Sequence, residues 1–268
     1  MTFWQKILHA LGLYKPSEPS QAPAPAPIPA QPKPAPTPAP SPVIEAPRPP
    51  VLEKTCPAPG VFGAVDLSQY CTQRFLDTMR YLKVGTIIRY YDWPGSPTLR
   101  EKIPTAAELA LIKKSGLQFC GVFQHNNSKL ASFTAARGKH DAGVALELAK
   151  KWGQPKGSAI YFGVDFDPSL SEQAAVKAYA VEFSKLARAA GFRVGAYGSG
   201  LTLQTLKTAG VIDLTWLSMS TGFRGSKDYA LSGKWNLKQV LDRNCGGINC
   251  DFDYVNPSQP DFGQWTLP

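Results

Sequence analysis

The segment AIYFGVDFDPSL, residues 159–170, indicates both the fold of the chain and the position of its candidate site. It begins with an uninterrupted apolar run, which is typical of a strand buried on both faces of a parallel sheet. The run leads into Asp165 and Asp167, which are spaced by one residue. Because side chains alternate along a strand, we expect Tyr161 and both aspartates on one face and Ile160 on the other.

Apolar runs of the same kind recur along the chain, and stretches with helical periodicity separate most of them. Strands are predicted near residues 61–66, 84–91, 117–124, 158–165, 192–198, 214–220, 237–241 and 248–255, and helices near 72–82, 105–115, 138–152, 171–190 and 201–209. Strands that alternate with helices predict an α/β fold with a parallel sheet. Up to eight strands without a glycine-rich dinucleotide motif favour a closed (β/α) TIM-like barrel over an open sheet. About 210 residues is short for this barrel, so we expect an irregular last third with short strands and few helices.

Two changes of composition divide the chain into three regions. Residues 56–268 form the predicted barrel. Residues 16–55 form a Pro/Ala-rich region, in which 16–50 hold fifteen of the 25 prolines. This composition predicts a disordered, extended polyproline linker. Residues 1–15 carry apolar side chains at helical spacing, which predicts a short amphipathic helix; these are Phe3, Trp4, Ile7, Leu8 and Leu11.

The amphipathic helix at the end of a linker is typical of a docking or targeting segment. Its partner would be a membrane surface or a groove on secretion or phage machinery, and an unstructured terminus is the alternative. Residues 1–15 are too short to span a bilayer. They also lack a basic region ahead of the apolar part, so they are not a convincing cleavable signal peptide.

The formal charge of +9 favours negatively charged partners, such as cell-wall polymers, although a basic surface without such a partner is equally compatible with it. The chain has no run of five Lys or Arg residues and no aromatic-plus-basic motif, so we do not expect nucleic-acid binding.

The five cysteines leave at least one thiol free in any intramolecular pairing scheme. Cys120 lies in an apolar run and is predicted to be a buried small hydrophobe. Cys245 could pair with Cys250 around the GGIN turn, and Cys56 could pair with Cys71, in an oxidising compartment. No CxxC motif occurs and the three histidines are scattered, so we predict no metal site and no cofactor.

Acidic, amide and aromatic residues follow the predicted strands at their carboxyl ends, where barrel active sites are built. Asp66 ends the first strand, and Asp251 lies near the end of the last. Carboxylates supply the acid and base of glycosidic bond cleavage, and aromatic rings stack on sugars, so the pattern predicts a sugar-binding cleft. For Asp167 the alternative is a turn that precedes a capping box. The residues assigned to substrate binding are Arg89, Tyr91, Gln124, Tyr161, Tyr197, Trp216, Gln239 and Asp253.

Several motifs occur in the order found in one family: GAVDLSQYC, IIRYY, GLQFCGVFQ, IYFGVDFD, GFRVGAYGS, LTWLSMSTGF and CDFDYVN. Residues 60–268 resemble the bacterial glycoside-hydrolase-like barrel domain, formerly a domain of unknown function, which is related to the family 25 glycoside hydrolases, the lysozymes. The resemblance implies a groove lined by Asp66, Asp165, Asp167 and Asp251. In family 25 the fourth strand carries Asp-x-Glu with the glutamate as acid, and Asp167 stands in the place of that glutamate.

The resemblance implies a peptidoglycan-directed, muramidase-like glycoside hydrolase. Asp167 would be the general acid/base, and Asp165 would stabilise the developing positive charge or orient the acetamido group of the substrate. Asp66 and Asp251 would tune these two groups. The alternative is a catalytically inactive cell-wall carbohydrate-binding module on a degenerate barrel. In either case we expect export to the periplasm, the cell envelope or the medium, with delivery by residues 1–15.

Overall fold

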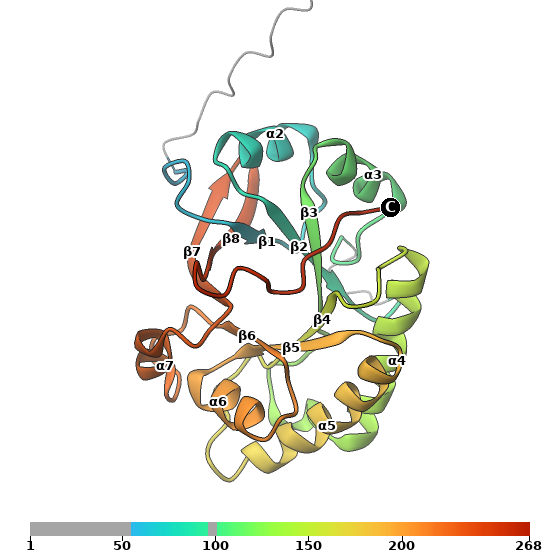
Figure 1. Ribbon diagram of the computed structural model, residues 1–268, viewed down its shortest axis with the longest axis vertical. Coiled ribbons are helices and arrows are strands. Elements are labelled where there is room, and N and C mark those ends of the chain that lie inside the picture. The colour runs from blue at the N-terminus through green and yellow to red at the C-terminus, as the bar shows by residue number, and fades with distance from the viewer. Residues whose placement is uncertain (1–54, 96–100) are drawn as a thin grey trace, which may run out of the picture. The chain divides into compact units, whose positions relative to one another are not determined.

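The protein is described here by a computed structural model that covers residues 55–95 and 101–268, in which eight strands close into a barrel (Figure 1). The strands are β1 (Ala64–Asp66), β2 (Thr86–Tyr91), β3 (Gln118–Phe123), β4 (Ala159–Gly163), β5 (Arg193–Gly198), β6 (Leu214–Leu217), β7 (Leu237–Cys245) and β8 (Ile248–Val255). The predicted (β/α) barrel is therefore confirmed. The helix and linker predicted for residues 1–55 lie, except for Thr55, outside the described residues.

Helices surround the barrel as the periodicity predicts. They are α2 (Gln73–Tyr81), α3 (Ala106–Lys114), α4 (Ala135–Lys151), α5 (Gln173–Ala189), α6 (Gly200–Thr208) and α7 (Ser226–Ser232), with a 3₁₀ turn at Leu130–Ser132. Four of them begin after a hydroxyl side chain that accepts a hydrogen bond from a backbone N–H in the first turn, which stabilises a helix by about 1 kcal/mol. These caps are Thr72, Thr105, Thr134 and Ser199. The short helix α7 was not predicted.

The last third departs from the regular pattern, as predicted, but its strands are long. No helix separates β7 from β8, and β8 runs antiparallel to both β7 and β1, whereas the strand–helix alternation predicted a parallel sheet. The cause is the turn Gly246–Gly247, in which both residues have positive φ, 65° and 83°. Two such residues form a tight hairpin turn that reverses the chain, and a parallel return would need a long crossover.

Side chains of β4 alternate between two cores, as the sequence predicts. Ile160 and Phe162 pack outward with the helices, whereas Tyr161 belongs to the core inside the barrel. Cys120 lies in the same interior core and is fully buried, as expected. Burial of an aromatic side chain of this size contributes about 2 to 3 kcal/mol, so both layers stabilise the barrel.

The segment that follows β8 closes one end of the barrel. Phe262 joins the interior core, and the Tyr161 hydroxyl donates a hydrogen bond to its carbonyl oxygen at 2.8 Å. Further along, Trp265 forms an isolated β-bridge with Phe119. Figure 1 shows this segment crossing the barrel opening that faces the viewer. The segment therefore covers the end of the barrel at which the parallel strands begin, opposite to their carboxyl termini.

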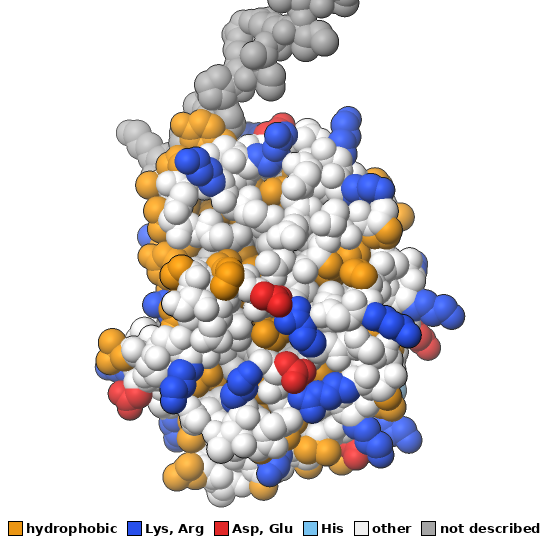
Figure 2. Space-filling model, in the orientation of Figure 1, with side chains coloured by type: hydrophobic (Ala, Val, Ile, Leu, Met, Phe, Trp, Pro, Cys, Tyr) orange, Lys and Arg blue, Asp and Glu red, His pale blue; other side chains and the backbone are white. Residues whose placement is uncertain are grey.

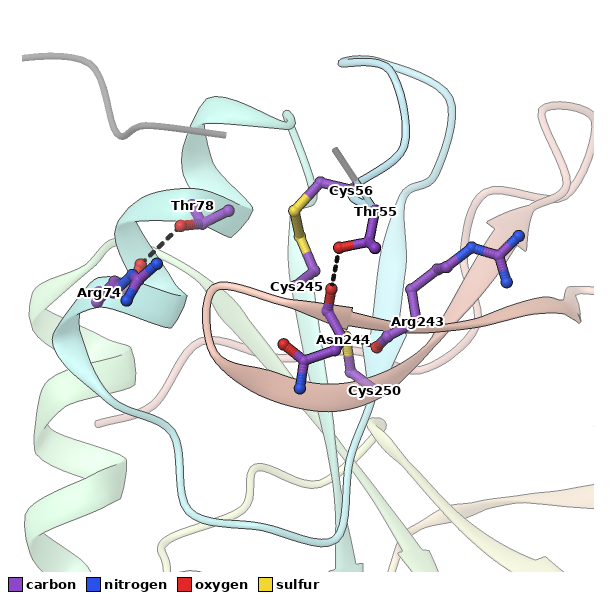
Figure 3. The surroundings of a disulfide bond; sticks show 8 residues. All are labelled: Thr55, Cys56, Arg74, Thr78, Arg243, Asn244, Cys245 and Cys250. Atoms are coloured by element: carbon purple, nitrogen blue, oxygen red, sulfur yellow. Dashed lines mark hydrogen bonds between the residues drawn. A yellow bond between two sulfur atoms is a disulfide. The ribbon is translucent and has the colours of Figure 1, made fainter. Parts of the chain in front are cut away.

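A disulfide joins the start of the barrel domain to the β7–β8 hairpin (Figure 3). It links Cys56 to Cys245, with 189 residues of sequence separation, and Thr55 beside it donates a hydrogen bond to the Asn244 carbonyl oxygen. The two predicted pairings, Cys245–Cys250 and Cys56–Cys71, are wrong. In the hairpin Cys250 lies opposite Arg243 rather than opposite Cys245. Among the described residues, the free thiols are those of Cys71, Cys120 and Cys250, and all three are buried.

Lys and Arg side chains are spread over the face of the molecule seen in Figure 2, and they do not gather in one patch there. The basic side chains on this face are thus dispersed rather than clustered. In the described part of the chain no helix is both long enough and apolar enough to cross a bilayer.

Glycine permits the close contact between α4 and α5. A Cβ atom at Gly138 would lie 2.1 Å from the Tyr179 carbonyl oxygen. Alanine in a helix normally stabilises by about 0.5 to 1 kcal/mol relative to glycine, but here it would force the helices apart. We expect Gly138→Ala to lower the free energy of unfolding by about 2 kcal/mol, measured by chemical denaturation.

The matched control for this prediction is Gly143 on the same helix, where an added Cβ would meet no described atom within 4 Å. Gly143→Ala is expected to raise stability by about 0.5 to 1 kcal/mol. Equal effects of the two substitutions would contradict the assignment of a helix–helix contact to Gly138.

Candidate active site

The open end of the barrel holds a cavity of about 280 Å³. Six of its lining residues were predicted from the sequence: Gln124, Asp165, Tyr197, Trp216, Gln239 and Asp251. Five others were not: Tyr90, Val122, Gly163, Met219 and Ser220. The volume is near the lower limit of about 300 Å³ for small-ligand sites, so it suits one part of a larger ligand whose remainder lies outside.

Two carboxyl groups meet at the side of the cavity formed by β1, β7 and β8. The Gln239 amide donates hydrogen bonds to Asp66 Oδ2 at 2.9 Å and to Asp251 Oδ2 at 3.2 Å. The Tyr90 hydroxyl donates to Asp66 Oδ1 at 2.8 Å. Asp66 is 1% exposed and lies directly opposite Asp251 in the β1–β8 register. Asp251 thus lines the cavity, and Asp66 lies behind it.

Burial and mutual repulsion raise the proton affinity of this pair. Burial, with a further contribution from the charge of Asp251, raises the pKa of Asp66 to about 7, although the hydrogen bonds from Gln239 and Tyr90 oppose this effect. Burial raises the pKa of Asp251 to about 6, with smaller contributions from the charges of Asp242 and Asp165. Carboxyl groups with such pKa values retain a proton close to neutral pH, which a general acid requires.

A third carboxyl group, that of Asp165, reaches the cavity from the segment after β4. The Gln124 amide donates a hydrogen bond to Asp165 Oδ2 at 3.0 Å, and the backbone N–H of Asp165 donates to the Asn127 carbonyl oxygen at 2.9 Å. These two contacts fix both the backbone and the side chain. The structure therefore brings Asp66, Asp165 and Asp251 together at one end of the barrel, as the sequence predicted.

The aromatic side chains fall into two levels. Tyr197 lines the cavity, and its hydroxyl lies 2.9 Å from Gln239 Oε1. Trp216 forms the floor and donates a hydrogen bond to Asp253 Oδ1 at 2.7 Å. Asp253 and Tyr161 lie in the closed interior, fully buried and outside the cavity lining. Their predicted contact with substrate is therefore wrong, and they support the floor instead.

The carboxyl group of Asp253 is held without charge compensation. Its Oδ2 atom has no hydrogen-bond partner among the described residues. Burial raises the pKa of Asp253 well above its usual range, and the charge of Asp66 adds to this effect, against the hydrogen bond from Trp216. A neutral Asp253 beneath the cavity adds no further repulsion to the pair above it.

Asp167 does not line the cavity, in contrast to the groove that the sequence predicted. Its carboxylate accepts hydrogen bonds from the Arg224 backbone N–H at 2.9 Å and from the Arg224 guanidinium at 2.7 Å. The physical reason is that β4 ends at Gly163. Beyond the strand the side chains no longer alternate, so the two-residue spacing does not place Asp167 beside Asp165.

Arg89 and Tyr91 also differ from the prediction, because both point from β2 toward the helices. The Arg89 guanidinium is fully buried and forms an ion pair with Glu108 at 2.8 Å. The Tyr91 hydroxyl donates a hydrogen bond to Gln154. The neighbour between them, Tyr90, has the opposite orientation and lines the cavity. Strand alternation from Ile88, an interior core residue, was the signal that could have identified Tyr90.

A second polar cluster lies beside the cavity and was missed by the sequence interpretation. His125 Nδ1 is 2.6 Å from Asp92 Oδ1, and the His125 ring stacks on Trp93 with 3.8 Å between centroids. The Lys102 ammonium donates to the Gln124 carbonyl oxygen at 2.6 Å and lies 4.8 Å from the centroid of the Tyr90 ring. Burial lowers the pKa of Lys102, although nearby Asp92 and Asp165 oppose this effect.

The carboxyl groups are not arranged for a metal ion. Within residues 55–95 and 101–268, no group of three His, Cys, Asp or Glu side chains is placed to coordinate one. The side chains of Asp165 and of the Asp66–Asp251 pair can form hydrogen bonds and exchange protons in the space between them.

A family model described as the Rv2525c-like, glycoside hydrolase-like domain matches residues 77–258. The chain belongs to this family. Two uncharacterized proteins of Bacillus subtilis strain 168 are related to it: YbfG, 27% identical over 198 residues, and FadG, 30% identical over 169 residues. The matches cover 69% and 60% of this chain but 27% and 29% of those proteins. The chain thus spans little more than a quarter of the length of these relatives.

Solved structures share the fold of this Rv2525c-like domain. The Mycobacterium tuberculosis Tat-secreted protein Rv2525c superposes with a TM-score of 0.64 at 21% identity, over 77% of this chain and all of that chain. An uncharacterized protein of B. stearothermophilus has a TM-score of 0.56 at 16% identity, with the same coverage. At these identities the likeness establishes the barrel fold.

Proposed function

We propose that the domain is a glycoside hydrolase that cleaves peptidoglycan or a related cell-wall polysaccharide in the cavity at the open end of the barrel. In this proposal Asp251, backed by Asp66, donates the proton to the leaving oxygen, and Asp165 stabilises the positive charge that develops on the sugar. Tyr90 and Tyr197 would form the walls, and Trp216 the floor, against which the sugar ring packs.

The observation that carries this proposal is the placement of three carboxyl groups around one small cavity with aromatic walls. Asp165 and Asp251 line it, and Gln239 connects Asp251 to the buried Asp66. Glycoside hydrolysis needs a carboxyl group that is protonated near neutral pH and a second one that acts on the other side of the bond. The glycoside-hydrolase-like family and the distributed basic surface, which suits an anionic polymer, add support.

The test is mass spectrometry of soluble muropeptides after the purified protein is incubated with purified sacculi. We expect products with a new reducing end, and the sugar that carries this end identifies the bond that is cut. The control is the same protein after heat denaturation. An unchanged muropeptide pattern over prolonged incubation, with the protein still folded, would contradict hydrolysis.

A second candidate function is binding of the same polysaccharide without cleavage. The observation that favours it is the ion pair between Asp167 and Arg224, because it engages the residue that stands in the place of the family 25 acid. Co-sedimentation with insoluble peptidoglycan, combined with no release of reducing ends, would select this alternative.

We further propose that the domain works after export. The Cys56–Cys245 disulfide supports this, because such bonds persist in oxidising compartments, and Rv2525c is described as Tat-secreted. The amphipathic segment at residues 1–15 would then direct the domain to a membrane surface or to secretion or phage machinery. Deletion of residues 1–15 would change localisation and leave hydrolysis by the purified protein unaltered.

A further inference from the structure

A β-bulge changes the direction in which one acidic side chain of β7 points. In a regular strand, Gln239 and Asp242 would lie on opposite faces, because three positions separate them. The pairing of β7 with β8 shifts between Gln239 and Leu241, so that Val240 is an extra residue. As a result Gln239 lies opposite Asp253 and Asp242 lies opposite Asp251. The bulge therefore brings Asp242 to the face that carries the cavity, as bulges beside functional sites commonly do.

The register now places three aspartates in one row across three adjacent strands. Asp242 on β7 is opposite Asp251 on β8, and Asp251 is opposite Asp66 on β1. Residues directly opposite in an antiparallel pair have Cβ atoms about 5 Å apart, and like charges there repel. Asp242 is exposed, and among the described residues no hydrogen bond or ion pair engages its carboxylate. Its charge is thus left to act on Asp251.

We propose that Asp242 is a positioning residue that, placed opposite Asp251 by the bulge, makes Asp251 the carboxyl group of the cavity that holds the proton. This inference rests on the proposed function. Asp242 is not among the residues that line the cavity. It acts only through Asp251, because a negative charge on the solvent side disfavours a second negative charge on the cavity side.

The electrostatics agree with the geometry. Burial is the largest cause of the raised pKa of Asp251. The charge of Asp242 is the second cause, and the charge of Asp165 is the third. The other titratable groups that face Asp251 come from the elements around the cavity, and they are Asp66 on β1, Tyr90 on β2, Asp165 after β4, Tyr197 on β5 and Asp253 on β8. Tyr90, Asp165 and Tyr197 line the cavity, and Asp66 and Asp253 are buried behind its lining. Asp242 is exposed and is not a lining residue, so it can be changed without altering the shape of the cavity.

The decisive experiment is an NMR titration of the Asp251 carboxyl carbon in the full domain, in wild type and in Asp242→Asn. We expect the midpoint of Asp251 in the variant to fall by about half a unit to one unit. The matched control is Asp228→Asn, which removes an exposed aspartate of α7 and the same unit of net charge, and it should leave the midpoint unchanged. An equal midpoint in wild type and Asp242→Asn, or an equal fall in both variants, overturns the inference.

The pH dependence of hydrolysis distinguishes an electrostatic role of Asp242 from a structural one, because loss of a structural contact would not shift the pH profile. If Asp251 supplies the proton, kcat/KM falls as the pH rises through its midpoint, and Asp242→Asn moves this limb to lower pH by the same amount as the NMR titration. An active variant whose limb does not move contradicts the inference and leaves the proposed function standing. A wild type that hydrolyses no sacculi contradicts the proposed function, while the titration still decides whether Asp242 controls Asp251.

Discussion

Replacement of Asp165 with asparagine is expected to lower kcat/KM for the release of reducing ends from sacculi by about a thousandfold or more, whereas Asp167→Asn leaves the rate within a few-fold of wild type. Asp165 lines the cavity and is oriented by Gln124. Asp167 is engaged by Arg224 outside it. Loss of one carboxyl group in proton transfer or charge stabilisation typically removes a factor of about 10² to 10⁴.

The two substitutions form a matched pair, because each changes one aspartate of the same Asp-Phe-Asp motif. The Asp167–Arg224 ion pair is partly exposed, with 23% and 51% of the two side chains accessible. Such pairs contribute about 0 to 1 kcal/mol, so Asp167→Asn should fold normally, which circular dichroism can verify. The interpretation from sequence alone makes Asp167 the general acid and predicts that Asp167→Asn is inactive, so a folded but inactive Asp167→Asn would favour that interpretation.

The second large effect concerns stability and the buried carboxyl group of Asp66. Its pKa rises from 3.8 to about 7 on folding. Between these values the folded state binds more protons than the unfolded state, so the stability contributed by the protonated group is present at acid pH and is lost as the pH rises toward 7. A rise of three units corresponds to about 4 kcal/mol. Asp66→Asn, which stays neutral, should therefore be more stable than wild type at pH 8 by an amount of this order.

Guanidinium unfolding at pH 4.5 and pH 8 measures this effect as the difference between variant and wild type at each pH. We expect the difference to be small at pH 4.5, where Asp66 is protonated in the folded protein, and large at pH 8. Asp77→Asn, an exposed substitution on α2, is the control and should show little difference at either pH. A variant that is less stable than wild type at pH 8 contradicts the prediction that the ionised, buried carboxylate of Asp66 destabilises the folded state.

Much of the fold could be predicted because hydrophobic pattern and strand–helix alternation act locally. The same reasoning located Asp66, Asp165 and Asp251, since the carboxyl ends of parallel strands meet at one end of a barrel. The prediction failed for residues that were assigned to substrate binding only because their side chains suit it. Arg89 and Tyr91 have suitable groups, but alternation along β2 directs both away from the cavity.

Other errors arose where the regular structure ends. The alternation that places Tyr161 in the interior stops at Gly163, so it gave no information on Asp167. Met219 and Ser220 reach the cavity from the segment after β6, and loop residues carry no periodic signal. The effect of the bulge at Val240 on Asp242, and the pairing of Cys56 with Cys245, depend on tertiary contacts that a sequence pattern does not encode.

The disulfide also determines how the domain would respond to mechanical force. A pull applied between the chain ahead of Cys56 and the chain after β8 passes through the two sulfur atoms directly into the hairpin turn, so β1 to β7 lie in a closed loop that is not stretched. Asp165 is shielded inside this loop, whereas Asp251 lies on β8, on the path of the force. A domain pulled at both ends would therefore be under tension first in the strand that carries Asp251.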